Sequence, residues 1–464
     1  MLRGFSVSNF KSFNDTQTIS LAASKIVRHN DHVVTIANRK ILKSGIIFGA
    51  NAGGKSNLIK AIAFSRDIIM KGIDNVDLNK KYFRITPNSF NRPAVFEYDI
   101  IANGKEYSYG IAISYAKREI ISEWLVRIDK SGKEFTIFNR NVDDNGTSVV
   151  ETDVEKEMKP NSKSSSMRLH VYFEDFGKEI APALRKKTIL SDIASRSNNK
   201  RGILSEIIHV YEWFTNMIII FPDSKYNLIN EIASNDDRRK FFQNILSFFD
   251  TGIESISKQQ RSMDFDKVLA DFPREQADQI KIELSKIANE HPVTFRIGKQ
   301  AIILRKDSDG NIIYNKLVLN HGNKDNPFEY ADESDGTQRL FDLVPLLYEN
   351  NEPRVIFIDE IDRSLHTNVC RKFIELFFEL TKNVDSQLIA TTHDSNIMDL
   401  DLLRQDEIWF VEREEDHSST LYSLNKFKAR FDKVVKNDYL IGRYGAIPLF
   451  HGIFSTEVDA LNEE

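Results

Sequence analysis

A glycine-rich segment near the N-terminus is the pattern in this chain with the clearest chemistry. It reads Gly49-Ala50-Asn51-Ala52-Gly53-Gly54-Lys55-Ser56 and is followed by Asn57. Glycines allow backbone N–H groups to close around phosphate oxygens, and a helix that begins here adds positive partial charge. Lys55 would reach the β- and γ-phosphates of a nucleotide, while the Ser56 hydroxyl would bind Mg²⁺. We therefore expect a phosphate-binding loop formed by Gly49, Asn51, Gly53, Gly54, Lys55, Ser56 and Asn57.

The segments on either side of this loop have the patterns that a phosphate loop needs. Residues 45–48 are apolar and predict a strand, and residues 55–70 predict a helix. Without that strand and helix, the same glycines would indicate only a turn with a surface lysine. With them, the strand-loop-helix order favours nucleotide binding.

A second candidate segment is an apolar strand that ends in two carboxylates. Residues 355–358 are all apolar, and Asp359 and Glu360 follow them directly. In open α/β sheets, ligands bind beyond the carboxyl ends of the strands, so both acids would face the phosphates. Asp359 would hold Mg²⁺ through water, and Glu360 would orient and polarise an attacking water. The alternative interpretation is a strand that ends in a helix-capping acid.

A third apolar strand, residues 387–392, ends at His393 and Asp394. The same edge of the sheet would then carry an imidazole, which we expect to sense the γ-phosphate. A lone histidine is often structural, so this role depends on the other two strands being its neighbours.

A fourth candidate segment precedes the acidic strand. Ser334 and Gly336 open an apolar-periodic run that begins at Leu340, which predicts a helix start. Such a start can bind an anion, although a simple helix cap is the more common meaning of the pattern.

Composition sets the class of protein. The chain has 464 residues, 41% of them hydrophobic and 28% charged, with a net charge of −5. These values are typical of a soluble protein of two or three domains, and they oppose DNA coating through bulk charge. Cys370 is the single cysteine, which excludes a disulfide scaffold and suits a reducing cytoplasm. The apolar runs are too short for a membrane span, and we expect neither a signal peptide nor a membrane partner.

The elements that must position these residues suggest three segments and an α/β fold. Residues 1–150 would form an N-terminal ATPase lobe with the phosphate loop and, between 93 and 140, an antiparallel meander. Residues 141–170 are polar and predict a linker or mobile loop, and 151–290 are mostly helical in spacing, predicting a helical insert. Residues 291–464 alternate helices with short apolar strands, which predicts a parallel sheet in a C-terminal lobe.

The order of these motifs resembles the ABC-type ATPases, and most of all the branch with the RecF, SMC and OLD proteins. Within that branch the chain is similar to bacterial AAA-family ATPases of the RloA, PARIS and Septu anti-phage defence type. Besides the loop and the acidic strand, the resemblance rests on residues 9–13, Ile361-Asp362, Ser364-Leu365-His366, 404–409 and 442–448. It implies a P-loop ATPase head with a mixed or parallel sheet, an antiparallel β subdomain and an insert.

The resemblance also implies a site shared between two copies of the chain. Lys55 and Ser56 would bind ATP and Mg²⁺ in one protomer, while Ser334 and Gly336 of another would approach the γ-phosphate. Ile361-Asp362 would lie at the seam, and Lys11 near the phosphates. This sequence departs from the family where Ser-Asp-Gly-Thr-Gln replaces Ser-Gly-Gly-Gln, and where residues 80–93 lack the expected metal-contacting glutamine. That glutamine's role is left unassigned.

Several functions compete. The preferred hypothesis is an ATP-binding and hydrolysing switch that forms homo-oligomers and controls an effector such as a separate nuclease, in anti-phage defence. The alternative is a DNA-maintenance or DNA-bridging ATPase of the RecF or SMC kind, although the insert lacks the long heptads of SMC proteins. A transporter subunit is opposed by the insert, and a self-contained OLD nuclease by the short tail after His393. Basic runs at 185–187, 200–201 and 238–240 leave DNA open as a partner, with solvated helix faces as the alternative.

Overall fold

The computed structural model divides the chain into two compact units. Unit 1 contains Met1–Phe221, Glu352–Ile361 and Val384–Glu464, and unit 2 contains Pro222–Asn351 and Asp362–Asn383. The residues that the structure describes are 1–143, 145–157, 163–179, 183–196, 202–223, 235–261, 274–285, 293–297, 300–306, 312–323, 325–348, 353–427 and 434–448.

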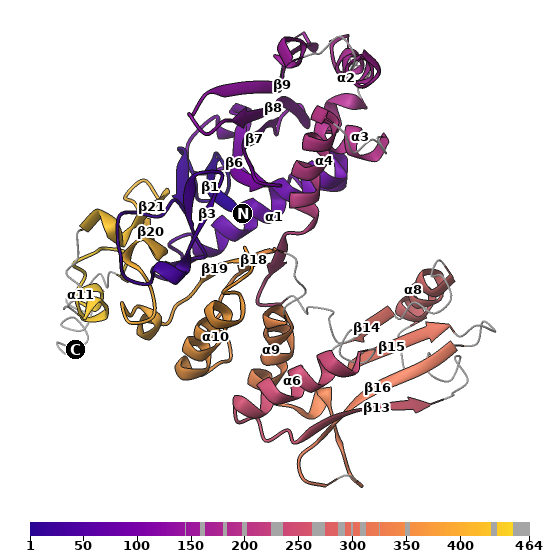
Figure 1. Ribbon diagram of the computed structural model, residues 1–464, viewed down its shortest axis with the longest axis vertical. Coiled ribbons are helices and arrows are strands. Elements are labelled where there is room, and N and C mark those ends of the chain that lie inside the picture. The colour runs from indigo at the N-terminus through magenta and orange to yellow at the C-terminus, as the bar shows by residue number, and fades with distance from the viewer. Residues whose placement is uncertain are drawn as a thin grey trace, which may run out of the picture. The chain divides into compact units, whose positions relative to one another are not determined.

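A mainly parallel sheet in unit 1 (Figure 1) carries the phosphate loop, the acidic pair and His393. Its strands, in spatial order, are β12 (Ile218–Ile220), β18 (Val355–Ile358), β19 (Gln387–Thr391), β5 (Ser44–Phe48), β20 (Ile408–Arg413) and β21 (Ser419–Ser423). The first five run parallel, and β21 is antiparallel to β20. Every residue of β5, β18 and β19 is buried, because a central parallel strand is covered on both faces. That burial explains why these strands are continuous apolar runs.

The second sheet of unit 1 is antiparallel. It has the order β11-β10-β9-β8-β7-β6-β1-β2, so its N-terminal strand lies inside the sheet. The strands are β1 (Leu2–Ser8), β2 (Gln17–Ser20), β6 (Ala94–Ala102), β7 (Lys105–Ser114), β8 (Glu119–Ile128), β9 (Glu134–Val142), β10 (Thr147–Glu151) and β11 (Lys178–Glu179). A separate hairpin joins β3 (Val33–Ile36) to β4 (Arg39–Leu42).

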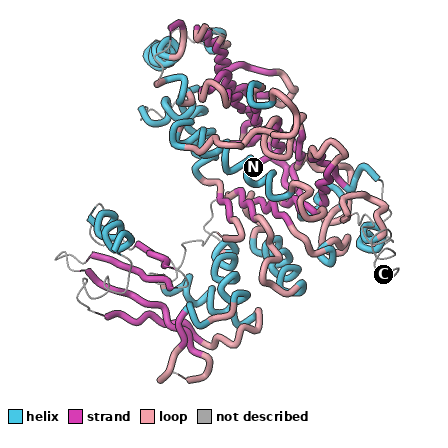
Figure 2. Tube along the Cα trace, turned by 180° about the vertical axis from the view of Figure 1, so that it is seen from behind, coloured by secondary structure: helices cyan, strands magenta, loops and turns pink. Residues whose placement is uncertain are grey.

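Unit 1 has five helices among the described residues, and four of them, α1 to α4, contribute to one core. The five helices are α1 (Lys55–Lys71), α2 (Lys163–Asp175), α3 (Ile189–Arg196), α4 (Gly202–Thr215) and α11 (Val435–Leu440). Figure 2 shows helices running along the strands of the antiparallel sheet. The core joins the buried face of α1, for example Leu58 and Ile62, to aromatic side chains of the antiparallel sheet, for example Tyr98 and Tyr109. The phosphate-loop helix is therefore anchored on a rigid layer.

Unit 2 has a sheet and helices of its own. Its strands are β13 (Ser255–Arg261), β14 (Val293–Ile297), β15 (Gln300–Lys306), β16 (Ile312–Asn320) and β17 (Phe328–Glu329), and its helices are α6 (Asp236–Phe248), α8 (Arg274–Ser285), α9 (Asp335–Leu343) and α10 (Thr367–Leu380). The sheet is antiparallel, in the order β13-β16-β15-β14, with β17 paired to β16. Phe242 of α6, Leu319 of β16 and Phe341 of α9 share a core.

The predicted α/β fold class is confirmed, and the structure refines its details. The meander expected at residues 93–140 is the run β6 to β9. The prediction that 141–170 form a linker is wrong for 147–151, because β10 pairs with β9 and extends the sheet. In the insert, β12 joins the parallel sheet, and α3 and α4 pack into the core of unit 1. Parts of the insert, among them 224–234 and 262–273, lie outside the described residues.

Within the part of the chain that the structure describes, no helix combines the length and the apolarity needed to cross a bilayer. This agrees with the short apolar runs of the sequence.

One buried amide ties the two sheets of unit 1 together. Gln387, the first residue of β19, is fully buried. Its Nε2 donates to the carbonyls of Leu2 and Leu42, both at 2.8 Å, and its Oε1 accepts from the Leu2 N–H at 2.5 Å. The side chain therefore fixes the start of β19 against β1.

We predict that Gln387→Leu lowers the free energy of unfolding by about 3 kcal/mol, because buried backbone groups lose their partners. The matched control is Gln17→Leu, which removes one half-buried hydrogen bond to the Leu421 N–H and should cost about 1 kcal/mol. Urea unfolding measures both. Equal losses in the two variants would contradict the role given to Gln387.

Candidate functional site

The glycine-rich loop occupies the turn between β5 and α1, and two of its glycines are required by contacts. A Cβ on Gly49 would lie 2.3 Å from the carbonyl oxygen of Val411. Gly54 has φ +118°, and a Cβ there would lie 2.3 Å from Ser419 Oγ. A side chain at either position would displace the backbone, so the loop keeps this shape only with glycine.

Two serines outside the motif hold the loop in place. Ser419 Oγ donates to the Gly53 carbonyl at 2.6 Å, and Asn57 Nδ2 donates to Ser12 Oγ at 2.9 Å. The Ser419 N–H in turn donates to the Ser12 carbonyl at 2.8 Å. The loop is thus braced from the N-terminal segment and from β21, two regions far away in the sequence.

Lys55 lies at the first position of α1, and its side chain folds over the loop. It is 4% exposed. Its Nζ donates to the carbonyls of Gly49 at 2.7 Å and Ala50 at 3.1 Å. The same Nζ lies 3.2 Å from His393 Nδ1. The lysine of one strand-loop-helix unit therefore meets the histidine that follows β19.

His393 connects Lys55 to the acidic strand. An ammonium only donates hydrogen bonds, so Nδ1 of His393 is the acceptor and the neutral ring carries its proton on Nε2. That Nε2 lies 3.6 Å from Glu360 Oε1. Both side chains are about one-third exposed, at 38% and 32%. Ammonium, imidazole and carboxylate therefore lie in series along one edge of the sheet.

The acidic pair after β18 is fixed by Thr391. The hydroxyl of Thr391 donates to Asp359 Oδ1 at 2.6 Å, and it accepts from the Glu360 N–H at 2.8 Å. Asp359 is 2% exposed. Glu360 has φ +52°, an unfavourable backbone conformation for a residue with a side chain. The turn that presents the two carboxylates is thus held by its neighbour strand.

The register of the sheet explains why these groups meet. Ile358 pairs with Ala390, and Thr391 pairs with Ile47, so β18, β19 and β5 end within a residue or two of one another.

Ser56 and Asn57 follow Lys55 in the first turn of α1. Hydroxyl and carboxylate oxygens such as those of Ser56 and Asp359 are ligands that Mg²⁺ prefers. Asn51, at the loop tip, is exposed.

Positive charge gathers beside the loop. Burial lowers the pKa of Lys11, and the neighbouring cations Lys81, Lys60 and Arg84 lower it further. Lys11 precedes Ser12, which contacts the loop residue Asn57. Such a cluster of cations is stabilised by a bound polyanion.

Ser334 and Gly336 belong to unit 2, and their local geometry is that of a helix start. Ser334 Oγ accepts from the Thr337 N–H at 3.1 Å, so it caps α9. A Cβ on Gly336 would lie 2.8 Å from the carbonyl oxygen of Ser364. The helix-cap interpretation is therefore correct locally, and the hydroxyl can also donate a hydrogen bond.

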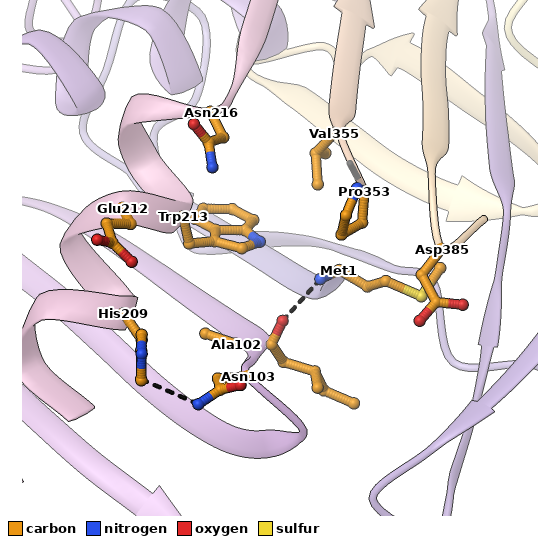
Figure 3. Close-up of a pocket in the computed structure, with 11 residues that line it drawn as sticks. Met1, Ala102, Asn103, His209, Glu212, Trp213, Asn216, Pro353, Val355 and Asp385 are labelled. Carbon is orange, nitrogen blue, oxygen red and sulfur yellow. Dashed lines mark hydrogen bonds between the residues drawn. The ribbon is translucent and has the colours of Figure 1, made fainter. Parts of the chain in front are cut away.

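A cavity of about 300 Å³ lies elsewhere in unit 1 (Figure 3). Its lining includes Met1, His209, Trp213, Val355 and Asp385. Val355 is the first residue of β18, so the cavity lies toward the amino ends of the parallel strands, whereas Asp359 follows the carboxyl end. The lining also contains Glu212. The carboxylates of Asp385 and Glu212 in this lining would repel a triphosphate.

Three of the six described cations in the basic runs at 185–187 and 238–240 pair with carboxylates. Arg185 lies 3.6 Å from Glu119, Lys186 lies 2.9 Å from Asp74, and Arg239 lies 2.6 Å from Asp236. These pairs favour the interpretation as solvated surface. The run at 200–201 lies outside the described residues.

A loop of this shape on a central parallel strand, with an acidic strand two positions away in the same sheet, defines the class of P-loop ATPases. A family model described as "AAA domain, putative AbiEii toxin, Type IV TA system" matches residues 46–155 and 182–399. That is more than half of the chain, so the protein belongs to this family of AAA-domain ATPases. The predicted resemblance to AAA-family ATPases is thereby confirmed.

Solved structures with similarity to this chain include two SMC heads. One is the SMC head bound to the C-winged helix domain of ScpA, with TM-score 0.37, 15% identity and coverage of 92% of this chain and 99% of that chain. The other is the SMC head domain from Thermotoga maritima, with TM-score 0.35, 13% identity and coverage of 91% and 98%. No curated protein matches the chain.

Sequence reasoning missed three residues of the site. Thr391, Ser12 and Ser419 hold the loop and the carboxylates, yet none belongs to the motifs singled out for chemistry. Ser12 lies within the resembling segment 9–13, and Thr391 lies two residues before His393. No sequence pattern marks Ser419 as part of the site, because only the fold brings it to the loop.

We predict that Thr391→Val lowers the free energy of unfolding by about 2 to 3 kcal/mol, because a buried carboxylate and a backbone N–H each lose a hydrogen bond. Thr392→Val is the control: it is also buried, and its hydroxyl accepts only the Asp394 N–H among the bonds described, at 3.0 Å. Chemical denaturation compares the two. A Thr391→Val protein as stable as the parent would refute this role.

Proposed function

We propose that this chain binds and hydrolyses ATP with Mg²⁺, that a second copy completes each site, and that the resulting assembly controls an effector protein in anti-phage defence. The observation that carries the first part is the convergence of Lys55, His393 and Glu360 at one sheet edge, with Nζ to Nδ1 at 3.2 Å and Nε2 to Oε1 at 3.6 Å. These three residues follow three different strands.

The binding role belongs to the loop and to α1. Backbone N–H groups of the loop and of the helix start would hold the phosphate oxygens, with Gly49, Asn51, Gly53 and Gly54 keeping the backbone open. The Lys55 ammonium would give up its hydrogen bonds to the loop carbonyls and donate to the β- and γ-phosphates instead. A hydrogen bond to a charged acceptor is the stronger one. Ser56 and Asp359 would hold Mg²⁺, which neutralises charge on the phosphate oxygens during transfer.

The hydrolytic role belongs to the two groups beyond β18 and β19. Glu360 would orient a water and accept its proton as the oxygen attacks the γ-phosphorus and ADP leaves. His393 would donate from Nε2 to the γ-phosphate oxygen, because its Nδ1 already accepts from Lys55. The proton moves to Glu360 Oε1, a carboxylate about one-third exposed and so open to water.

The second copy would contribute Ser334 and Gly336. The start of α9 presents N–H groups and a serine hydroxyl, a combination that binds anions. The resemblance to ABC-type ATPases supports placing this helix start against the γ-phosphate of a partner protomer. ATP would then hold the two copies together, with Ile361-Asp362 near the seam.

The control of an effector rests on the family. Its description names an AbiEii toxin and a type IV toxin–antitoxin system, and the sequence resembles defence ATPases that act with partner proteins. A separate effector chain, such as a nuclease, would read the nucleotide-bound assembly. The alternative of a DNA-maintenance ATPase gains little support from the basic runs, because three of their six described cations already pair with carboxylates.

We predict that Glu360→Gln binds ATP, hydrolyses it at least about 100-fold more slowly, and accumulates the associated form. Light scattering of this variant with and without Mg²⁺ and ATP measures the association. The mass without nucleotide is recorded first, so that a constitutive oligomer is recognised. A mass that ATP leaves unchanged in an otherwise monomeric variant would contradict a nucleotide-bridged interface.

A mixing experiment tests whether the site is shared. Lys55→Ala chains should not bind ATP, because the phosphates lose their charged partner, and Ser334→Arg chains should bind ATP without hydrolysing it. In a mixed dimer, one site would combine an intact Lys55 with an intact Ser334. An equal mixture should therefore recover about a quarter of the parent ATPase rate, as half of the dimers carry one of two sites.

The control for this mixture is Lys71→Ala, which removes an exposed lysine at the other end of α1. It should keep the full rate alone. If the mixture of the two inactive variants stays inactive although the chains associate, each site is built within one chain and the shared-site proposal is wrong.

A further inference from the structure

A cluster of metal-binding side chains lies in unit 1 away from the phosphate loop. His29, Asp31 and His32 each offer one ligand atom, and these three atoms lie within 4.8 Å of one another. The residues belong to the turn before β3, and the two imidazoles stack with ring centroids 4.9 Å apart. We propose that this cluster binds a transition-metal ion, with Zn²⁺ as its best match. The proposal does not depend on the ATPase function.

Each histidine already has an oxygen partner for one ring nitrogen. His29 Nε2 lies 2.9 Å from the Leu400 carbonyl, and His32 Nδ1 lies 3.0 Å from Glu407 Oε2. Both oxygens are acceptors, so the neutral rings carry their protons on these nitrogens, and the other nitrogen of each ring bears the lone pair. A carboxylate or carbonyl behind a histidine is the arrangement that orients metal-binding imidazoles.

The buried carboxylate behind His32 points to a missing positive charge. Glu407 is 0% exposed, and its Oε1 has no hydrogen-bond partner among the described residues. An ionised carboxylate in such surroundings needs a cation nearby. A metal ion on His32 would supply it, and the competing explanation is a proton on His32. The second carboxylate, Asp31, is exposed, which gives an ion access from solvent.

Lys43 is a cation that interacts electrostatically with Asp31. It is buried, and burial lowers the pKa of its ammonium, while Asp385 and Asp31 raise it. The other buried cation here, Arg404, is already paired with Asp406, so Asp31 and Glu407 carry two negative charges against the one of Lys43. The site therefore still favours a divalent ion, and imidazole nitrogens with one carboxylate select zinc over magnesium or calcium.

The surrounding contacts make the cluster a built feature of the fold. Arg404 is 1% exposed, and its guanidinium donates to the carbonyls of Ile26 at 3.0 Å and Arg28 at 2.8 Å. Asp406 accepts from the N–H and the hydroxyl of Ser24 at 2.7 and 2.6 Å. The segment 404–407 thus clamps the turn that carries the three ligands. A bound ion would strengthen the attachment of this turn to segment 404–407.

The experiment first removes bound metal from the full chain with a chelator. Zn²⁺ is then titrated into the protein without nucleotide or Mg²⁺, and the heat of binding is measured by calorimetry. Co²⁺ with visible absorption is the second probe, because its spectrum reports imidazole ligands. We expect one site that is lost in His29→Ala and in the conservative, exposed variant Asp31→Asn. Glu407→Gln should weaken it by about 10- to 100-fold, since it changes only the group behind His32.

Two controls keep the test specific. His170→Ala removes an exposed histidine paired with Glu174, and Asp359→Asn alters the proposed Mg²⁺ site; both should keep Zn²⁺ and Co²⁺ binding. The proposal is overturned if the parent chain binds neither metal. It is equally overturned if binding survives in both His29→Ala and Asp31→Asn, or is lost in Asp359→Asn.

Discussion

In a parallel sheet the carboxyl ends of all strands meet at one edge, and this chain places a polar residue at that edge after three neighbouring strands. The paired residues of β18, β19 and β5 are aligned within a residue or two, so Asp359, His393 and the loop before Lys55 need no further device to come together. Lys55 and Glu360 are more than three hundred residues apart in the sequence, but the sheet brings them to the same edge. The register of these strands is the constraint on which the whole site depends.

The aligned strand ends bring charged groups of both signs together, and hydrogen bonds from neighbouring side chains hold these groups in place. Thr391 holds both acidic residues, and His393 lies between Glu360 and Lys55. Ser12 and Ser419 support the loop from behind. Because carboxylates, imidazole and ammonium already compensate one another, the proposed triphosphate and its metal would enter by exchange of partners. The site does not need to bury a new charge alone.

Much of this site could be predicted from the sequence, because its motifs are local. The glycine spacing, the apolar run before Asp359 and the run before His393 each specify a strand and the polar residues at its carboxyl end. The supporting residues could not be predicted, because a single serine or threonine carries no pattern. Ser419 reaches Gly53 only through the pairing of β21 with β20. Strand β10 was hidden because a short strand with polar neighbours has the composition of a loop.

Unit 2 was harder to foresee for a related reason. The strand β13 of its antiparallel sheet lies between α6 and α8 in the sequence, and the helical spacing of these two helices dominates the pattern there. The start of α9 shows the limit most clearly: a helix cap and an anion site would use the same residues, and Ser334 indeed caps the helix. Only a second chain can decide the other role.

The most direct test of the central claim is a structure of the Glu360→Gln chain with Mg²⁺ and ATP bound. We expect the triphosphate to lie against residues 49–55, with the metal held by Ser56 and Asp359 and with His393 facing the γ-phosphate. A triphosphate bound elsewhere, for example in the cavity lined by Met1 and Trp213, or a metal that contacts neither Ser56 nor Asp359, would contradict the claim.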